Sequence, residues 1–130
     1  MDPQQRILIE TAYHALENGM SIKKSYKKKT NKLAGIAMES IIKSKTSVHT
    51  GCFTADYAAL SSRDPEVASK YAAIGTSPAM LANRISWFFD LVGPSVNLDS
   101  ACSSSMMALD QACQGLWNSD TTMVSSHEAS

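Results

Sequence analysis

The sequence predicts an α/β fold in which helices flank a central sheet. Short segments rich in β-branched residues alternate along the chain with longer segments of helical periodicity, which is the element order of α/β domains. The chain has 130 residues, of which 44% are hydrophobic, and this is enough to build a core. No apolar run approaches the length that crosses a bilayer, so we expect no membrane partner.

The first helix is predicted over residues 3–18. Asp2 can cap this helix, Pro3 suits its first position, and Gln5 completes a capping box. The periodicity is that of an amphipathic helix, with apolar residues at Leu8, Ile9, Ala12, Tyr13 and Leu16.

The first strand is predicted over residues 46–53, where β-branched and aromatic residues surround the turn-forming Gly51. Residues 34–44 have the mixed character of a loop or short turn, and residues 55–65 are predicted as a loop. Residues 66–72 can form one or two helical turns.

The second half of the chain repeats the alternation of helix and strand. We expect a helix over residues 78–89, a short strand over 95–98, a sharp turn over 99–102 and a helix over 103–117. Another strand begins within residues 121–125. The last helix is expected to bury an apolar face made of Met106, Leu109, Ala112, Cys113 and Leu116.

Charge is balanced overall but unevenly distributed. The 12 basic and 12 acidic residues cancel, which gives no general bias toward nucleic acid or an anionic membrane. Residues 19–33, however, contain no acid and hold six lysines: Lys23, Lys24, Lys27, Lys28, Lys29 and Lys32. One interpretation of this segment is a nucleic-acid-binding or nuclear-localisation patch.

The three cysteines, Cys52, Cys102 and Cys113, lack CxxC spacing, which fits neither a disulfide framework nor a structural zinc site. We therefore expect free thiols in a reducing compartment and no bound metal. The N-terminal residues also lack the hydrophobic segment of a signal peptide, so a cytoplasmic protein is predicted. Cys52 and Cys113 are interpreted as buried packing residues.

Cys102 is the candidate nucleophile. It lies where the predicted strand 95–98 turns into the helix 103–117, and small residues surround it. Unpaired backbone N–H groups at a helix start favour an anion, and the thiolate is the nucleophilic form of cysteine. The alternative from the residues alone is that Cys102 fills a small buried slot, as many free cysteines do.

Four segments resemble ketosynthase motifs. Residues 99–105, Asp-Ser-Ala-Cys-Ser-Ser-Ser, resemble the nucleophile motif Asp-Thr-Ala-Cys-Ser-Ser-Ser, with Ser100 in place of threonine. Residues 1–6, 50–53 and 82–95 are similar to the segments that precede this motif. The chain is thus identified as similar to the N-terminal part of a β-ketoacyl synthase (ketosynthase) domain of a fungal type I polyketide synthase, in the thiolase-like superfamily.

The resemblance implies a fragment of a thiolase-like fold, with an incomplete central sheet and flanking helices. It implies that Cys102 accepts an acyl chain and that a malonyl-derived carbanion then attacks the acyl-enzyme in a decarboxylative Claisen condensation, in polyketide or fatty-acid biosynthesis. The chain would bind no cofactor directly, because the phosphopantetheine of an acyl carrier protein delivers the acyl groups. Its partners would be that carrier protein, acyl and malonyl thioesters, and a second copy in a homodimer.

Ketosynthases also use two histidines, and the resemblance assigns neither of them here. None of His14, His49 and His127 occupies a matching position. We expect structural roles for His14 and His49, while His127 lies in a segment that no longer resembles the family. The aromatic cluster at residues 87–89 is expected in the core, with some lining of an acyl channel.

Two segments depart from the family pattern. Removing residues 19–33 joins Asn18 to Ala34 and restores an uninterrupted ketosynthase-like sequence, which suggests a retained intron. Residues 125–130 form a non-matching tail, and the rest of residues 1–130 is interpreted as a partial ketosynthase N-terminal domain. Two alternatives stay open: a catalytically inactive remnant of a synthase gene, and a lysine-rich nucleic-acid-binding protein.

Overall fold

A parallel sheet forms the centre of the molecule. The computed structural model describes residues 1–26, 38–63 and 70–128. Its sheet has the strand order β2-β1-β3, and β1 pairs in parallel with both neighbours. The strands are β1 (Thr46–Gly51), β2 (Ser95–Leu98) and β3 (Met123–Glu128).

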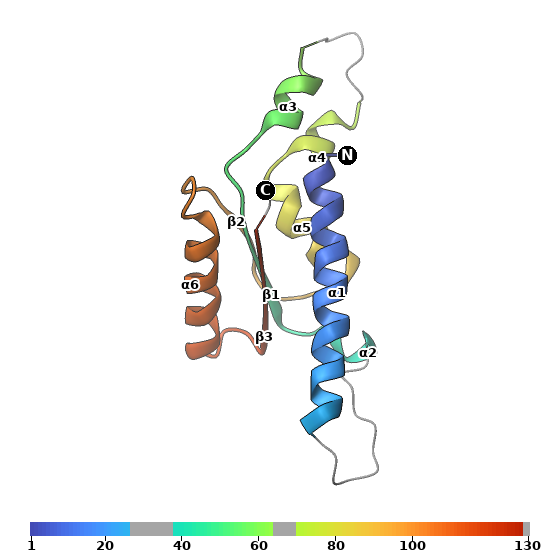
Figure 1. The fold of residues 1–130 in the computed structure, drawn as a ribbon, viewed down its shortest axis with the longest axis vertical. Helices are drawn as coiled ribbons and strands as arrows, with labels where there is room; N and C mark the ends of the chain where they lie inside the picture. The colour runs from blue at the N-terminus through green and yellow to red at the C-terminus, as the bar shows by residue number, and fades with distance from the viewer. Residues whose placement is uncertain (27–37, 64–69, 129–130) are drawn as a thin grey trace.

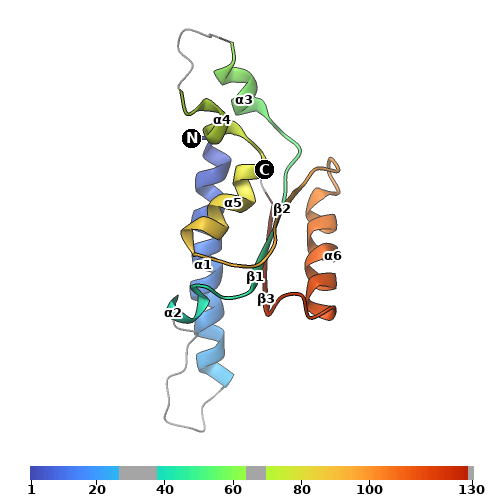
Figure 2. The same cartoon turned by 180° about the vertical axis from the view of Figure 1, so that it is seen from behind.

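Helices cover both faces of this sheet (Figures 1 and 2). On one face lie α1 (Pro3–Tyr26) and α5 (Ala79–Phe88), and on the other lies α6 (Ser104–Trp117). The described part of the chain also contains three short helices: α2 (Met38–Ile41), α3 (Asp56–Ser61) and α4 (Ala72–Thr76). The predicted α/β fold with flanking helices is confirmed.

The hydrophobic core lies between the sheet and the α1–α5 face. All six residues of β1 are buried, as expected for a central strand with helices on both sides. Val48 of β1 and Cys52 just after it contribute to this core, and α1 and α5 supply most of the remainder. Its buried members are Leu8, Ala12, Val48, Cys52, Leu81, Ala82, Ile85 and Phe89.

The opposite face packs differently, and here the predicted core is wrong. Small side chains one turn apart on α6 are buried instead: Ser104, Ala108 and Ala112. A row of small residues lets the helix backbone approach the sheet closely, so bulkier neighbours turn outward. Of the predicted face, Ala112 is buried and Cys113 half-buried, while Met106, Leu109 and Leu116 are exposed.

The aromatic cluster at the end of α5 is also only partly in the core. Phe89 is buried, but Trp87 is 80% exposed and Phe88 is 55% exposed. Consecutive side chains of a helix point in different directions, so the three aromatic side chains of residues 87–89 cannot all face the core. The Phe88 and Phe89 rings meet edge to face at a centroid distance of 4.9 Å.

Several element boundaries differ from the predictions. Helix α1 continues eight residues past Asn18, to Tyr26, because Met20, Lys23 and Lys24 are good helix formers that follow a single glycine. The loop predicted at residues 55–65 contains α3, and the segment 34–44 contains α2.

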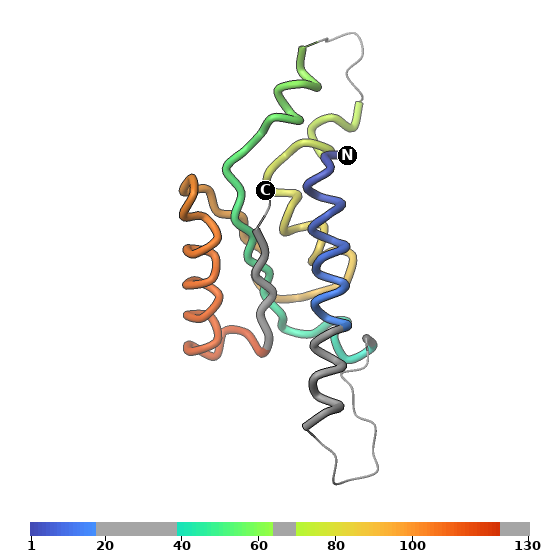
Figure 3. Tube along the Cα trace, in the orientation of Figure 1, coloured from blue at the N-terminus to red at the C-terminus, as the bar shows by residue number. Residues whose placement is uncertain are grey.

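Strand β1 ends at Gly51, two residues earlier than predicted, and β3 continues to Glu128, into the predicted tail. Parts of five predictions lie outside the described residues: 27–33 of the lysine-rich segment, 34–37 of the segment 34–44, 64–65 of the loop 55–65, 66–69 of the predicted helical turns, and 129–130 of the tail. Figure 3 traces the described elements as a Cα tube in the orientation of Figure 1.

Close backbone packing at Gly93 yields a stability prediction. A Cβ at Gly93 would overlap backbone atoms of Thr46 and lie 2.7 Å from the Ser47 nitrogen, whereas a Cβ at Gly115 of α6 would meet only Thr121 Oγ1 at 3.6 Å. We expect Gly93→Ala to lower the free energy of unfolding by about 1–3 kcal/mol, because overpacking against backbone cannot relax through a side chain.

The matched control is Gly115→Ala, which should raise the free energy of unfolding by about 1 kcal/mol, because alanine favours the helix over glycine. Urea unfolding monitored by circular dichroism measures both changes. Equal unfolding midpoints for the two variants would contradict the packing described at Gly93.

Candidate active site at the start of helix α6

The turn that follows β2 presents Cys102 to solvent. β2 ends at Leu98, Ser103 is the N-cap residue, and α6 begins at Ser104, so Cys102 lies immediately before the helix cap. Its side chain is exposed. The interpretation of Cys102 as filler of a buried slot is therefore wrong, and the predicted strand, turn and helix are all present.

Side-chain hydrogen bonds define the conformation of this turn. Ala101 has a φ of 54°, which is uncommon for a residue with a Cβ. The Ser104 hydroxyl accepts a hydrogen bond from the Ser100 amide at 2.8 Å and donates one to the Ala101 carbonyl oxygen at 2.6 Å. The Ala101 amide donates to Asp99 Oδ1 at 3.2 Å, and the Ser103 hydroxyl donates to the Ser100 carbonyl oxygen at 2.8 Å.

The end of β1 fixes this turn against the sheet. A Cβ at Gly51 would lie 2.6 Å from the Ser104 carbonyl carbon and 2.8 Å from the Ser105 nitrogen, so backbone meets backbone there. The neighbouring Thr50 hydroxyl donates to Asn97 Oδ1 of β2 at 2.7 Å, which ties the ends of the two strands together. Cys102 consequently lies at the carboxyl edge of a parallel sheet, where ligands of α/β proteins usually bind.

This arrangement suits nucleophilic attack by sulfur. The first backbone N–H groups of a helix have no partners within the helix and carry partial positive charge, so they stabilise an anion or a developing oxyanion nearby. Cys102 lies just before this helix start and is open to solvent. The amides of Ser103 and Ser104 already donate to the carbonyl oxygens of Ser100 and Ala101, so the influence of the helix start on Cys102 is that of its positive end rather than of these two N–H groups. A thioester carbonyl approaching Cys102 could therefore place its oxygen near the start of α6.

The other two cysteines are less accessible. Cys52 is buried, and its thiol lies within hydrogen-bond distance of Gln4 Oε1 at 3.5 Å and of the Thr54 carbonyl oxygen at 3.4 Å. Cys113 is half-buried on α6. The interpretation of Cys52 as a packing residue is confirmed, while Cys113 is only partly covered.

The described histidine side chains lie away from Cys102. His14 is exposed on α1, with Nδ1 3.8 Å from Glu17 Oε2. His49 is buried in β1, where its Nε2 is 3.2 Å from Ser47 Oγ. His127 belongs to β3, and its side chain lies outside the described residues.

A polar groove of about 270 Å³ opens between His49 and the second half of α6. Its helix residues begin at Gln111, nine positions beyond Cys102, which corresponds to about 13 Å along an α-helix. The groove therefore lies along the second half of α6, away from the turn that carries the thiol.

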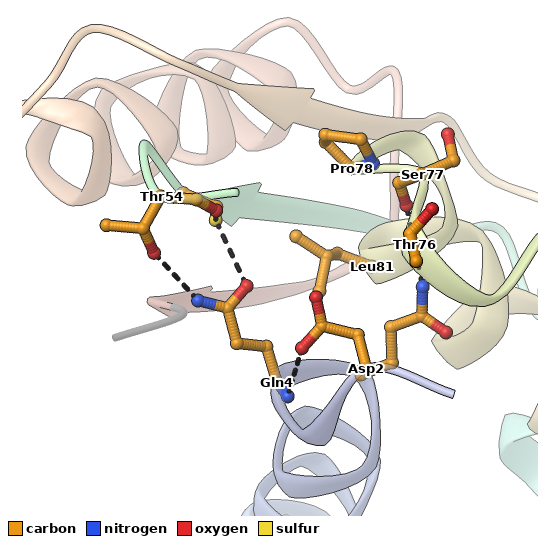
Figure 4. Close-up of a pocket in the computed structure, with 9 residues that line it drawn as sticks. Asp2, Gln4, Thr54, Thr76, Ser77, Pro78 and Leu81 are labelled. Atoms are coloured by element: carbon orange, nitrogen blue, oxygen red, sulfur yellow. Dashed lines mark hydrogen bonds between the residues drawn. The ribbon is translucent and has the colours of Figure 1, made fainter. Parts of the chain in front are cut away.

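A second, much smaller cavity lies at the start of α1 (Figure 4). Its volume of about 10 Å³ has room for a single water molecule and none for a substrate. Gln4 lies across it: its backbone amide donates to Asp2 Oδ1 at 2.9 Å, and its side-chain amide donates to Thr54 Oγ1 at 2.8 Å. These bonds connect the first turn of α1 to the segment after β1, which is a structural role.

Comparison with known proteins decides the family. The family model described as beta-ketoacyl synthase, N-terminal domain, matches residues 1–125, which is nearly the whole chain. This chain belongs to the β-ketoacyl synthase family. The nucleic-acid-binding protein and the inactive remnant are not favoured by this result.

Curated relatives are fungal polyketide synthases. The ketosynthase chain is 48% identical over 122 residues to a hybrid PKS-NRPS synthetase of Emericella nidulans, a match that covers 94% of this chain and 3% of the relative. It is 49% identical over 113 residues to the 6-hydroxymellein synthase of Talaromyces verruculosus, covering 87% of this chain and 4% of the relative. The chain thus spans only a few per cent of the length of these relatives.

Solved ketosynthases share the fold. The ketosynthase from module 6 of the bacillaene synthase of Bacillus subtilis 168 matches with a TM-score of 0.71 and 27% identity, covering 95% of this chain and 17% of that one. The oxazolomycin ketosynthase domain of Streptomyces albus matches with a TM-score of 0.69 and 32% identity, covering 98% of this chain and 19% of that one. The sheet and its helices therefore correspond to part of a thiolase-like fold.

Two further findings concern the described residues of this ketosynthase chain. Within residues 1–26, 38–63 and 70–128, no helix is long and apolar enough to cross a membrane. In the same ranges, no three of the side chains of histidine, cysteine, aspartate and glutamate gather in a group that could hold a metal ion.

Two residues that shape the site, Gly51 and Ser104, have no positioning role in the sequence predictions, which count Ser104 only among the small residues around Cys102. Gly51 is visible in the sequence only as a turn former at the end of a strand, and Ser104 only as one of several serines. A glycine at the end of a strand can mark a close approach of another backbone, but the sequence does not show that the partner is the start of α6, about fifty positions later.

His49 gives a pH-dependent stability prediction. Burial lowers the pKa of His49 below its ordinary value of 6.5, so the unfolded chain takes up a proton at this side chain at a higher pH than the folded chain does. The stability contributed by neutral His49 is present above the unfolded pKa and is lost as the pH falls toward the folded pKa.

We therefore expect the melting temperature to fall as the pH is lowered from about 8 to about 6, and His49→Gln to reduce that slope. The exposed-site variant His14→Gln is the control and should keep the wild-type slope. Thermal melts across this pH range measure both, and an unchanged slope in His49→Gln would contradict the assignment.

Proposed function

We propose that this chain supplies the nucleophile-bearing part of a ketosynthase and that Cys102 is its acyl acceptor. The observation that carries the proposal is the exposed thiol at the turn between β2 and α6, in a chain whose residues 1–125 match the ketosynthase N-terminal domain. Exposure supports the proposal because an acyl thioester must reach the sulfur.

Acyl transfer begins when the Cys102 thiolate attacks the carbonyl carbon of an acyl thioester. A bond forms between Sγ and that carbon, the carbonyl oxygen becomes an oxyanion beside the amides at the start of α6, and the bond to the carrier's sulfur then breaks. The carrier leaves as a thiolate and takes up one proton, which balances the proton that Cys102 lost. The product is an acyl-cysteine.

The second half-reaction would extend the chain. A malonyl thioester loses carbon dioxide, and the resulting carbanion attacks the acyl-cysteine carbonyl, which releases the Cys102 thiolate and leaves a β-ketoacyl thioester. We assign none of the described side chains to the decarboxylation, because His14 is exposed on α1 and the buried His49 lines the groove beside the second half of α6.

The proposed partner is an acyl carrier protein whose phosphopantetheine holds the acyl and malonyl groups, and no cofactor is proposed within the chain itself. Similarity to the curated fungal polyketide synthases supports polyketide biosynthesis as the pathway class. We further propose a cytoplasmic location and self-association as a homodimer, both by analogy with ketosynthases.

Direct acylation tests this function. The chain is incubated with the acetyl thioester of N-acetylcysteamine, and peptide mass spectrometry then locates the acetyl groups. Cys102 should be acylated at least about tenfold faster than Cys113, because it is the more exposed thiol and lies at a helix start.

Variants of the two thiols complete the experiment. Cys102→Ser should lose the rapid acylation, while the matched variant Cys113→Ser should keep it. Equal acylation of Cys102 and Cys113, or rapid acylation that persists in Cys102→Ser, would contradict the role proposed for Cys102.

A further inference from the structure

The residue before Cys102 has a backbone conformation that needs support. Ala101 has a φ of 54°, in the left-handed region, where the Cβ of an L-amino acid crowds the following carbonyl oxygen. Such a conformation persists only where the surrounding structure holds it. If Ala101 relaxed to a negative φ, the direction of the chain through Cys102 would change.

The Ser104 hydroxyl bonds to both sides of Ala101. It accepts from the amide of Ser100, the residue before Ala101, at 2.8 Å, and it donates to the carbonyl oxygen of Ala101 itself at 2.6 Å. The Ala101 carbonyl oxygen also accepts the Ser104 backbone amide at 3.0 Å, but the Ser104 hydroxyl is the atom that links this carbonyl to the Ser100 amide.

Burial distinguishes Ser104 from the other polar groups of the turn. Ser104 is only 4% exposed, so water cannot readily replace its hydroxyl. Asp99 and Ser103 also bond to this backbone, but both are exposed, and water can substitute for their bonds.

The position of Ser104 is itself fixed by β1. The Gly51 backbone contacts the Ser104 carbonyl group so closely that a Cβ at residue 51 would lie 2.6–2.8 Å from its carbon and oxygen. The hydroxyl thus belongs to a helix turn that is held against the central strand rather than to a mobile surface loop.

We propose that Ser104 is a positioning residue for Cys102: its buried hydroxyl holds Ala101 in the left-handed conformation and thereby aims the thiol outward at the start of α6. This role rests on the proposed function of Cys102 as acyl acceptor. Ser104 itself does not touch the reacting atoms in this account; it acts through the backbone of Ser100 and Ala101.

The test compares Ser104→Ala with Ser104→Thr, which keeps a hydroxyl, and with Ser103→Ala, which removes the adjacent exposed hydroxyl. Two quantities are measured on the full chain: hydrogen exchange of the Ser100 amide by NMR, and acylation of Cys102 by the acetyl thioester of N-acetylcysteamine.

In Ser104→Ala, we expect Ser100 exchange to accelerate about tenfold and Cys102 acylation to slow about tenfold, as for loss of one buried hydrogen bond. Ser104→Thr should recover most of both effects, and Ser103→Ala should stay within about twofold of wild type because water replaces its bond. Acylation of Cys113 by the same thioester should not change, because a positioning role for Ser104 predicts a loss of rate at Cys102 alone.

A compensating variant covers the case in which Ser104→Ala does not fold. Glycine adopts positive φ without penalty, so Ser104→Ala combined with Ala101→Gly should fold and regain rapid Cys102 acylation. A folded double variant that remains slow would overturn the proposal.

The proposal is also overturned if Ser104→Ala acylates at the wild-type rate or if Ser103→Ala slows acylation equally. A different result would contradict the proposed function of Cys102 as acyl acceptor: Cys102 would then be acylated neither in the wild type nor in any variant. The Ser100 exchange rates would still decide whether Ser104 holds the turn.

Discussion

The arrangement of the site depends on the backbone contact between Gly51, at the end of β1, and the first turn of α6. A side chain at residue 51 has no room, since a Cβ would lie within 2.8 Å of Ser104 and Ser105 backbone atoms. This contact seats the start of α6 on the carboxyl edge of the sheet. Cys102 lies immediately before the cap residue of that helix. The position of its thiol therefore depends on a backbone contact between Gly51 and the first turn of α6, which does not involve the sulfur atom.

The rest of the molecule makes this contact possible. β1 is the central strand of the described sheet and is buried along its whole length, with the α1–α5 core on one side and α6 on the other. The small residues Ser104, Ala108 and Ala112 let α6 approach that strand. A helix with bulky residues in this row would stand farther from β1, and the turn carrying Cys102 would lose its support.

Sequence patterns predicted most of the fold because the strands and long helices have clear periodicity. They indicated the helix at residues 78–89, the strand at 95–98 and the turn at Cys102, which the structure contains. The predicted buried face of α6 was wrong: hydrophobicity indicated Met106 and Leu116, but both are exposed. Only small side chains fit between this helix and the sheet, because the two backbones lie close together. Cys102 could be singled out as the candidate nucleophile from its motif. The roles of Gly51 and Ser104 could not be predicted, because the Gly51 contact joins residues about fifty positions apart and the Ser104 bonds depend on the direction of a hydroxyl group.

The most direct test of this account is the acylation of Cys102 in a Gly51→Ala variant, with Gly75→Ala as the matched control. A Cβ at buried Gly75 would meet its nearest atom at an ordinary 3.6 Å, so this variant should acylate like the wild type. In Gly51→Ala samples whose circular dichroism shows a folded chain, we expect Cys102 to lose its advantage over Cys113 toward an acetyl thioester. A folded Gly51→Ala chain that acylates Cys102 as selectively as the wild type would contradict the claim that this contact places the nucleophile.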